Sequence, residues 1–447
     1  MTSWPALTPQ AAGRATKGAG GHCGACSCRQ SGPHPAPTSA PLTTAAPAPT
    51  TLSTPAEPAG TAALRVRELD CVDALETLAD DWRSLLAAVD DDSPYLTPEF
   101  MIPWARMLAG QYRLCVLVVY QGSRLVGLAP FFERRLSKWG VGFTVRSFPL
   151  HGFSPPFDLV VDPATPQVID ALLDHLRRDR RWHLVELLNV ASASPNPALL
   201  RAACARQGLA FSSQPSLTTT HVRMAQSWDA YQQTLPRALR KTVRQGLRRL
   251  EQSGPVRVLR CPIDGTSVPE GVALALAVIA SSWKRFDDEQ VDWPAFLHEL
   301  TARLAARNML SLRLLMVGDR PAAYHLELDY RGNLHGLHNA YDLRLAGGAP
   351  GAVLLSEALR DAHARGCARF DFLGTKQYLE RWAQGQRDYL RLRITGTHPI
   401  TRLKTLLYDR VAQARKASAQ QDEEAQRLAR LGRSRGEPTG DDPPAAP

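Results

Sequence analysis

Residues 344–355, RLAGGAPGAVLL, place three glycines and a proline directly before a run with helical spacing. Glycine tolerates positive φ and lets another group approach the main chain closely, and the first N–H groups of a helix have no partner inside it. A phosphate or carboxylate would find hydrogen-bond donors at such a corner. The stretch therefore predicts an anion site at the start of a helix. The alternative is a tight turn that needs glycine for its geometry alone.

The chain has 447 residues, of which 44% are hydrophobic and 21% are charged, a composition typical of a soluble globular protein with two domains and tails. No run reaches the roughly 18 apolar residues of a membrane-spanning helix, and no secretory h-region opens the chain. We therefore expect a cytoplasmic protein without a transmembrane segment. The net charge of +10 favours acidic partners without selecting one.

The cysteines do not predict a metal site. Five stand singly in apolar context and suit reduced core thiols: Cys71, Cys115, Cys204, Cys261 and Cys367. A second group lies in the low-complexity segment GHCGACSC and comprises His22, Cys23, Cys26 and Cys28. Its spacing matches no closed four-ligand zinc pattern, so we predict that no metal is bound.

Composition and element order divide the chain into four parts. Residues 1–61 are rich in Ala, Pro and Thr, and residues 411–447 form a charged helical piece followed by Gly, Pro and Asp, so we expect disordered tails. Between them, residues 62–224 and 225–410 repeat one order of elements, which predicts two mixed α/β domains from a duplication. In the first, we expect helices at 72–89, 97–108, 167–178 and 197–207, and strands at 114–120, 124–134, 157–161, 183–190, 209–213 and 217–224. In the second, we expect helices at 271–286, 293–307, 352–364 and 375–384, and strands at 311–317, 322–330, 334–341, 368–373 and 388–394.

An ordered series of segments resembles the acyltransferase domain of the CelD/BcsL-like branch of the GNAT superfamily. The series is RPAAYHLEL (320–328), HNAYD (338–342), GGAPGAVLLSEALRDAHARG (347–366), FDFLG (370–374) and YLERW (378–382). In the first half, SPYLTPEF (93–100) and LVGLAPFFERR (125–135) are similar to the N-terminal region of that branch. Similar tandem GNAT folds occur in the Fem-type aminoacyltransferases that build peptidoglycan bridges. The resemblance spans about residues 65–397 and implies a tandem duplicated GNAT-like acyl-CoA N-acyltransferase fold.

The resemblance also implies a co-substrate, acetyl-CoA or another acyl-CoA. Its pyrophosphate would lie on the backbone of the glycine loop, and its pantetheine would lie beside strand 334–341, near Asn339. The loop residues expected to bind it are Leu345, Ala346, Gly347, Gly348, Gly351 and Ala352. The corresponding stretch of the first half, residues 161–166, has an acid and no glycine. We therefore expect no phosphate loop in the N-terminal domain.

GNAT enzymes attack the thioester directly, so the chemistry needs a base for the acceptor and an acid for the thiolate. The resemblance makes Tyr378 the candidate acid, although relatives usually have Lys directly after this Tyr, where this chain has Leu379. Strand 334–341 supplies His335, His338 and Tyr341 as candidates for the base or for acceptor positioning. The two histidines have opposite parity, so only one of them faces the site unless a bulge intervenes. Asp371 is a candidate for tuning a base, and Glu327, with His325, for the acceptor cleft.

The most basic segment, residues 236–251, combines an apolar stripe with six Arg and Lys side chains. It is either a solvated amphipathic helix or, through Arg240 and Arg244, a site for an anionic acceptor: a lipid-linked sugar, a nucleotide sugar or a tRNA acceptor stem. The residues together favour acyl transfer from acyl-CoA to an amine or hydroxyl on a small-molecule, glycan or lipid-linked acceptor, such as a cell-envelope or polysaccharide precursor. Nucleic acid is the less favoured partner, and peripheral membrane contact stays open. A Fem-like aminoacyl-tRNA-dependent transferase and a non-catalytic scaffold are the alternatives.

Overall fold

The computed structural model describes residues 63–138, 141–149, 155–179, 181–283, 291–374 and 377–396, with residues 401 and 405. The two predicted tails and the cluster of His22, Cys23, Cys26 and Cys28 lie outside the described residues.

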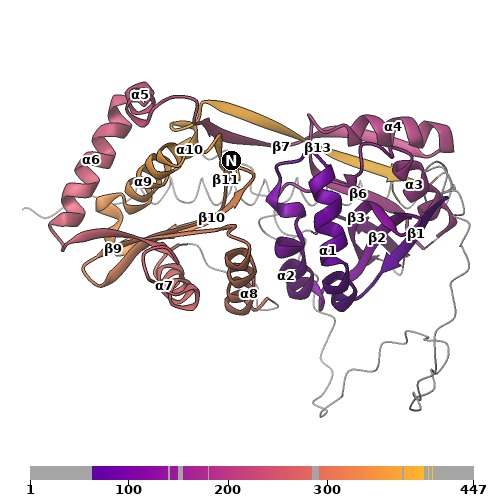
Figure 1. The fold of residues 1–447 in the computed structure, drawn as a ribbon, viewed down its shortest axis with the longest axis horizontal. Coiled ribbons are helices and arrows are strands. Elements are labelled where there is room, and N and C mark those ends of the chain that lie inside the picture. Colours follow the sequence, from indigo (N-terminus) through magenta and orange to yellow (C-terminus); the bar gives the residue numbers. More distant parts are fainter. Residues whose placement is uncertain are drawn as a thin grey trace, which may run out of the picture. The chain divides into compact units, whose positions relative to one another are not determined.

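In the first half of the described chain, helices alternate with strands (Figure 1). Its elements are β1 (Leu64–Leu69), α1 (Val72–Ala88), the 3₁₀ turn η1 (Pro94–Leu96), α2 (Pro98–Leu108), β2 (Arg113–Gln121), β3 (Arg124–Lys138), β4 (Val141–Ser147), β5 (Val160–Val161), α3 (Val168–Arg178), β6 (Leu184–Ala191), α4 (Asn196–Gln207) and β7 (Ala210–Arg223).

The second half repeats this order after two connecting helices, α5 (Trp228–Thr234) and α6 (Arg237–Glu251). Its elements are β8 (Val256–Cys261), α7 (Val268–Ala280), α8 (Trp293–Ala306), β9 (Leu310–Val317), β10 (Arg320–Tyr330), β11 (Asn333–Tyr341), η2 (Leu343–Gly348), α9 (Pro350–Ala364), β12 (Arg369–Asp371), α10 (Gln377–Glu380) and β13 (Gly385–Thr395). The predicted repeat of one α/β unit is therefore confirmed in the element order.

The described strands join in one sheet with the order β1-β2-β3-β4-β6-β13-β7-β12-β11-β10-β9-β8, and β5 pairs with β3. Two equivalent neighbours, β4 with β6 and β11 with β12, pair in parallel. The last strand of each half pairs with a strand of the other half. Strand β13 pairs with β6, β7 pairs with β12, and β7 and β13 pair with each other (Figure 1). The duplication is thus joined by a reciprocal exchange of terminal strands.

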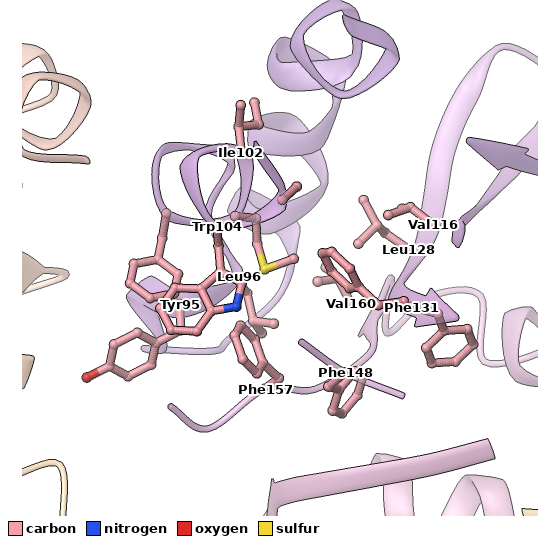
Figure 2. Packing of buried hydrophobic residues seen from close by; sticks show 14 of the residues in the cluster. Tyr95, Leu96, Ile102, Trp104, Val116, Leu128, Phe131, Phe148, Phe157 and Val160 are labelled. Atoms are coloured by element: carbon pink, nitrogen blue, oxygen red, sulfur yellow. The ribbon is translucent and has the colours of Figure 1, made fainter. Parts of the chain in front are cut away.

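Helices cover both faces of the strands of the second half. Helices α7 and α8 pack against one face, and α9 packs between the other face and α6 (Figure 1). In the first half, β2 is apolar on both faces because both are covered, and the core around it is aromatic. Figure 2 shows the hydroxyl of Tyr95 pointing away from this apolar cluster. That hydroxyl donates to the carbonyl of Gly336 in β11, at 3.4 Å, so the first core reaches the strands of the second half.

Most predicted helices are confirmed. Helix α2 begins with Pro98 at its first position, and Gly366 after α9 has the left-handed backbone expected of a helix end, with φ of 69°. The prediction of two strands at 209–213 and 217–224 was wrong: β7 is continuous. Pro215, between the two predicted strands, lies where the β7–β13 register shifts, a place that tolerates a residue without an N–H. Strands β1, β4 and β8 were not predicted, and of the expected strand 157–161 only Val160–Val161 pairs.

Candidate active site

The parallel pairing of β11 and β12 ends at His335 and Asp371, which lie directly opposite each other. The His335 Nδ1 atom is 3.7 Å from the Asp371 Oδ2 atom. On the other side of Asp371, the row continues across β7 to His221 and across β13 to Gly385. A Cβ on Gly385 would lie 2.5 Å from the His221 ring, so a glycine is needed there. The sheet therefore sets a histidine on either side of one carboxylate.

A β-bulge decides the direction of the two histidines of β11. The β10–β11 register pairs Leu326 with His338 and Glu327 with Gly336, which leaves Leu337 as the extra residue. His335 and His338 therefore face the same side of the sheet. Their partners differ, because His338 stacks on Tyr324 at 5.8 Å between ring centroids and hydrogen-bonds its hydroxyl. Of the two, His335 lines the pocket described next.

A small pocket of about 50 Å³ opens beside the His335–Asp371 pair, and both halves of the chain line it. The first half supplies acids from the loop before η1 and from the stretch before β5. The second half supplies His335 and Asp371. The polar residues of this pocket that the sequence analysis did not single out are Asp91, Asp92, Ser93, Tyr95, Asp158, Thr219, Arg387 and Tyr389. Two of these residues could have been found from the sequence, because the acidic run 90–92 directly precedes the segment SPYLTPEF.

Two arginines neutralise two of these carboxylates. Arg387 Nη1 is 3.1 Å and Arg369 Nε is 2.9 Å from Asp371 Oδ2, and both guanidinium groups also contact Asp92. Burial alone would raise the pKa of Asp92, but Arg387 and Arg369 outweigh it and lower that pKa. The network therefore holds Asp92 ionised and fixes the wall of the pocket next to His335.

His335 is nearly inaccessible, with 3% of its surface exposed. Burial lowers its pKa to about 4, although the nearby Asp371 opposes the shift. The imidazole is thus neutral near pH 7. Its Nε2 atom is buried and has no hydrogen-bond partner among the described residues. A neutral ring with one unpartnered nitrogen in a pocket can accept a proton, although a pKa of about 4 makes it a weak base at neutral pH.

The glycine loop forms η2 and the start of α9, joined by Ala349 in a left-handed conformation with φ of 46°. Its glycines have different surroundings. A Cβ on Gly348 would lie 2.5 Å from Leu250 Cδ2 of α6, so this glycine serves helix packing. A Cβ on Gly347 would meet nothing within 4 Å, and one on Gly351 would meet only Tyr341 Cδ1 at 3.5 Å. Two of the three glycines therefore border open space.

The donors of the loop are partly used. The N–H groups of Leu345 and Ala352 donate to Asp342 O and Ala349 O, at 3.0 and 2.9 Å. The N–H of Gly351 makes no backbone hydrogen bond within the described part of the chain. The carbonyl of Ala346 accepts from Ala349, and Arg249 of α6 donates to the Gly347 carbonyl at 2.9 Å. A free N–H at a helix start fits a phosphate group.

Tyr378 lies near this loop and not in the pocket. It is 46% exposed, and the side chain of Asn339 hydrogen-bonds its hydroxyl. Burial around the hydroxyl raises the pKa of Tyr378, with Tyr341 adding to the effect, so the phenol stays protonated at neutral pH. The structure thus brings Tyr378, Asn339 and Tyr341 together beside Gly351, on the C-terminal part of β11.

Three of the other predicted site residues lie elsewhere. Glu327 is 1% exposed in an ion-pair network with Arg313, which also pairs with Asp361 of α9. The structure therefore brings Glu327 neither to the pocket nor to the glycine loop. Arg240 and Arg244 are exposed on α6, which packs on η2 and α9. In the first half, Asp162 accepts the N–H of Ala164 at 2.9 Å, so the loop before α3 uses its donors locally.

Within the described ranges, no three His, Cys, Asp or Glu side chains form a group that could hold a metal ion. No helix in the same ranges is long and apolar enough to cross a membrane.

Comparison with known proteins agrees with the element order. Residues 237–389 match the family model described as an acetyltransferase (GNAT) domain. This part of the chain is a GNAT acetyltransferase domain. The GNAT domain makes the protein an acyltransferase, and GNAT folds generally bind acyl-CoA. No curated protein sequence matches the chain significantly.

Among solved structures, "Crystal structure of FemX" is 12% identical with a TM-score of 0.51, over 73% of this chain and 98% of that one. A "Tandem GNAT protein from the clavulanic acid biosynthesis pathway" is 15% identical with a TM-score of 0.44, over 75% of this chain and 100% of that one. The C-terminal domain of a putative lysylphosphatidylglycerol synthetase from Agrobacterium fabrum is 11% identical with a TM-score of 0.46, over 74% and 95%. The FemX likeness extends over both halves, and the whole described chain has a tandem GNAT-like fold.

Proposed function

We propose that the protein transfers an acetyl or other acyl group from acyl-CoA to an amine or hydroxyl acceptor, such as a cell-envelope or polysaccharide precursor, as a member of the CelD/BcsL-like branch. The observation that carries the proposal is the position of the neutral His335. It lies where β11 and β12 stop pairing, while the open Gly347 and Gly351 lie at the far end of β11. A base and a phosphate loop at opposite ends of one strand suit the two ends of an extended acyl-CoA.

The residues of the glycine loop have different roles in binding acyl-CoA. Gly351 offers a free N–H at the start of α9, and Gly347 leaves room for the pyrophosphate. Gly348 and Leu250 lock the loop against α6, and Arg249 fixes the Gly347 carbonyl. Acyl-CoA supplies the acyl group in activated form, as a thioester.

In this mechanism, the acceptor attacks the acyl carbon directly. The new N–C or O–C bond forms while the C–S bond breaks, and no acyl-enzyme is needed. His335 Nε2 takes the proton of the acceptor, and Asp371 favours the resulting imidazolium, whereas Arg369 and Arg387 oppose its charge and hold Asp371 in place. Tyr378, which stays protonated at neutral pH, is the candidate donor to the departing thiolate, and this role requires the thioester to lie on β11 between His335 and Asn339.

The runner-up is a Fem-like aminoacyl-tRNA-dependent transferase. One observation favours it: Arg240, Arg244 and Arg248 are exposed on α6 and have no ion-pair partner among the described residues. Exposed cations on one helix attract a nucleic-acid backbone as readily as a phosphorylated small molecule. A scaffold that has lost its chemistry is the third candidate.

A thermal-shift panel of acyl-CoAs and an aminoacyl-tRNA separates the three. We expect acetyl-CoA or a longer acyl-CoA to raise the Tm, and thiol release to follow when a lysate fraction is added. A shift with the aminoacyl-tRNA alone would favour the Fem-like function. No shift with any of them would favour the scaffold.

A further inference from the structure

The α1–α2 connection, residues 89–97, brings part of the first half into contact with His335 of the second half. Its η1 turn places the Tyr95 ring edge-to-face against the imidazole, with 6.1 Å between the ring centroids and 83° between the planes. This separation is within the range in which aromatic rings attract each other beyond the effect of burial. Tyr95 is 4% exposed and lines the same pocket as His335. The connection therefore forms part of the surroundings of the imidazole.

The Tyr95 hydroxyl also contacts the strand that carries His335. It donates to the carbonyl of Gly336 at 3.4 Å, directly after the last residue of β11 that pairs with β12. Burial raises the pKa of Tyr95 well above its usual range, and Asp371 adds to the effect, so the hydroxyl keeps its proton and acts as a donor. Leu337, the extra residue of the bulge, comes next. Tyr95 thus holds the backbone where β11 leaves β12 and the bulge begins.

These contacts restrict the imidazole and leave its Nε2 atom unused. Asp371 Oδ2 is 3.7 Å from the Nδ1 atom of His335, and Tyr95 packs on the ring while its hydroxyl donates to Gly336. Rotation of the imidazole by half a turn would exchange the places of Nδ1 and Nε2, and a second ring packed against it hinders that rotation. The Nε2 atom stays without a hydrogen-bond partner among the described residues. The arrangement therefore orients the nitrogen that we propose as the proton acceptor.

Arg331, in the turn between β10 and β11, attaches the α1–α2 connection to the second half. Its Nη1 atom donates to the carbonyls of Val89 and Asp91, both at 2.8 Å, and its Nη2 atom donates to the carbonyl of Leu86 at 2.7 Å. The last carbonyls of a helix have no partner inside it and carry a partial negative charge. Helix α1 has no basic residue in its own last turn. Arg331 therefore supplies the cation at the end of α1 from the other half of the chain.

Two further observations support this attachment. Asp92 pairs with Arg369 of β12 and Arg387 of β13, so a second contact with the second half follows the first along the connection. Arg331 itself has a left-handed backbone with φ of 49°, which costs free energy in a residue other than glycine. Such a cost persists where the surrounding contacts fix the residue. The segment that leads into Tyr95 is thus held by three arginines of the second half.

We infer that Tyr95 is a positioning residue for His335 and that Arg331 acts on the same histidine through the α1–α2 connection. The inference rests on the proposed function and gives the first half a part in acyl transfer. Arg331 is exposed and is not among the residues that line the pocket. Its effect on the reaction therefore has to pass through the connection that it holds.

A double-mutant cycle in the full chain measures this link, with kcat taken from thiol release in the presence of acetyl-CoA and the lysate fraction that supports it. Tyr95→Phe keeps the ring and removes the donor, and Arg331→Gln removes the guanidinium at an exposed site. We expect each to lower kcat about three- to tenfold, while the Kd for acetyl-CoA from calorimetry changes less than about twofold. Because both act through one segment, the double variant should fall no more than about twofold below the less active single variant.

Arg65→Gln is the matched control for Arg331→Gln. Arg65 is also an exposed arginine that donates to a main-chain carbonyl, that of Gly122 at 3.1 Å, but both residues lie in the first half away from the connection. The control should leave kcat unchanged, and a melting curve of each variant checks that it is folded. Losses in Tyr95→Phe and Arg331→Gln that multiply in the double variant, no loss in either, or an equal loss in Arg65→Gln would overturn the inference.

Carbethoxylation of His335 by diethyl pyrocarbonate, followed by peptide mass spectrometry, tests the same link without acyl transfer. His335 is 3% exposed, so it should react slowly in the wild type. Arg331→Gln loosens the connection and should speed the reaction at least about fivefold, whereas Arg65→Gln should not. An unchanged rate in Arg331→Gln would count against the positioning role.

The two measurements tell a failure of this inference from a failure of the proposed function. If thiol release occurs and neither kcat nor the labelling of His335 responds to Arg331→Gln, the acyltransferase proposal stands and the positioning role falls. If no acyl-CoA binds and no thiol is released, but Arg331→Gln exposes His335 to the reagent, the link between the two residues stands and the proposed function falls.

Discussion

Gly351→Asp places a carboxylate at the start of α9, where we propose that the pyrophosphate of acyl-CoA lies. The substitution is compatible with the fold, because a Cβ at this position would meet only Tyr341 Cδ1 at an ordinary 3.5 Å. Two unit charges 4 Å apart repel by about 4 kcal/mol at the effective dielectric constant of a protein surface. Salt and solvent screening reduce this, and a net loss of about 2.7 kcal/mol corresponds to a factor of one hundred in Kd.

Isothermal titration with acetyl-CoA measures this loss, and a melting curve checks that the variant is folded. Gly351→Ala is the matched control: it adds the Cβ without the charge and should lose far less affinity. Gly348→Ala should behave differently again, because its Cβ would lie 2.5 Å from Leu250 Cδ2 and the packing of α6 must shift, which lowers the Tm. A folded Gly351→Asp protein with the affinity of the wild type would refute the assignment of this loop to the phosphates.

Two further substitutions separate binding from chemistry. Tyr378→Phe removes a proton donor from an exposed side chain, so kcat should fall about ten- to a hundredfold while the Kd for acyl-CoA, measured by titration, changes less than twofold; an unchanged kcat would exclude Tyr378 as the acid. His335→Gln should lower kcat/KM and also change the pH dependence of unfolding. The folded protein holds the pKa of His335 at about 4, below the unfolded value of about 6.5, so stability falls as the pH falls through this window, by at most about 3 kcal/mol. Denaturant unfolding at pH 7 and pH 4.5 should show a smaller fall in His335→Gln, and an equal fall would place the proton uptake elsewhere.

The periodicity of apolar residues and the turn chemistry predicted most helices and the duplicated order, because both are local signals. The exchange of β7 and β13 was not predictable in the same way. Each strand has an ordinary strand pattern, and nothing in that pattern says which half supplies the neighbour. Strands β1 and β8 were not predicted for a related reason. Most of their residues are exposed or half-buried, as is typical of edge strands, so their polar sequences resemble linkers.

The candidate site was also predicted where local sequence decides it and missed where strand pairing decides it. Asp371 and His335 could be named from the strands that carry them, and the parity question for His338 needed the bulge at Leu337, which depends on the pairing with β10. For Glu327, the role suggested by the sequence does not match its position in the structure. An acid on a strand beside the site suggested a role in the acceptor cleft, whereas its partner Arg313 lies on the neighbouring strand β9 and takes it into a separate buried network. Only the fold could pair those two residues.

The strand exchange makes a last prediction about the two halves as separate chains. Leu392 and Ile394 of β13 are at most 1% exposed and belong to the core cluster that includes the strands of the first half, and Val222 of β7 belongs to a core of the second. A fragment of residues 62–224 would lose the burial of Leu392 and Ile394, worth about 4 kcal/mol, and would leave β6 and β7 with open edges. Residues 225–410 alone would lose β7 from between β12 and β13, together with Tyr95 and the rest of the α1–α2 connection. Each fragment should therefore unfold without cooperativity in circular dichroism, and mixing the two should restore a single cooperative transition and acyl transfer. If residues 225–410 folded alone and kept full activity, neither the exchanged strand nor the α1–α2 connection would have the role that the structure suggests.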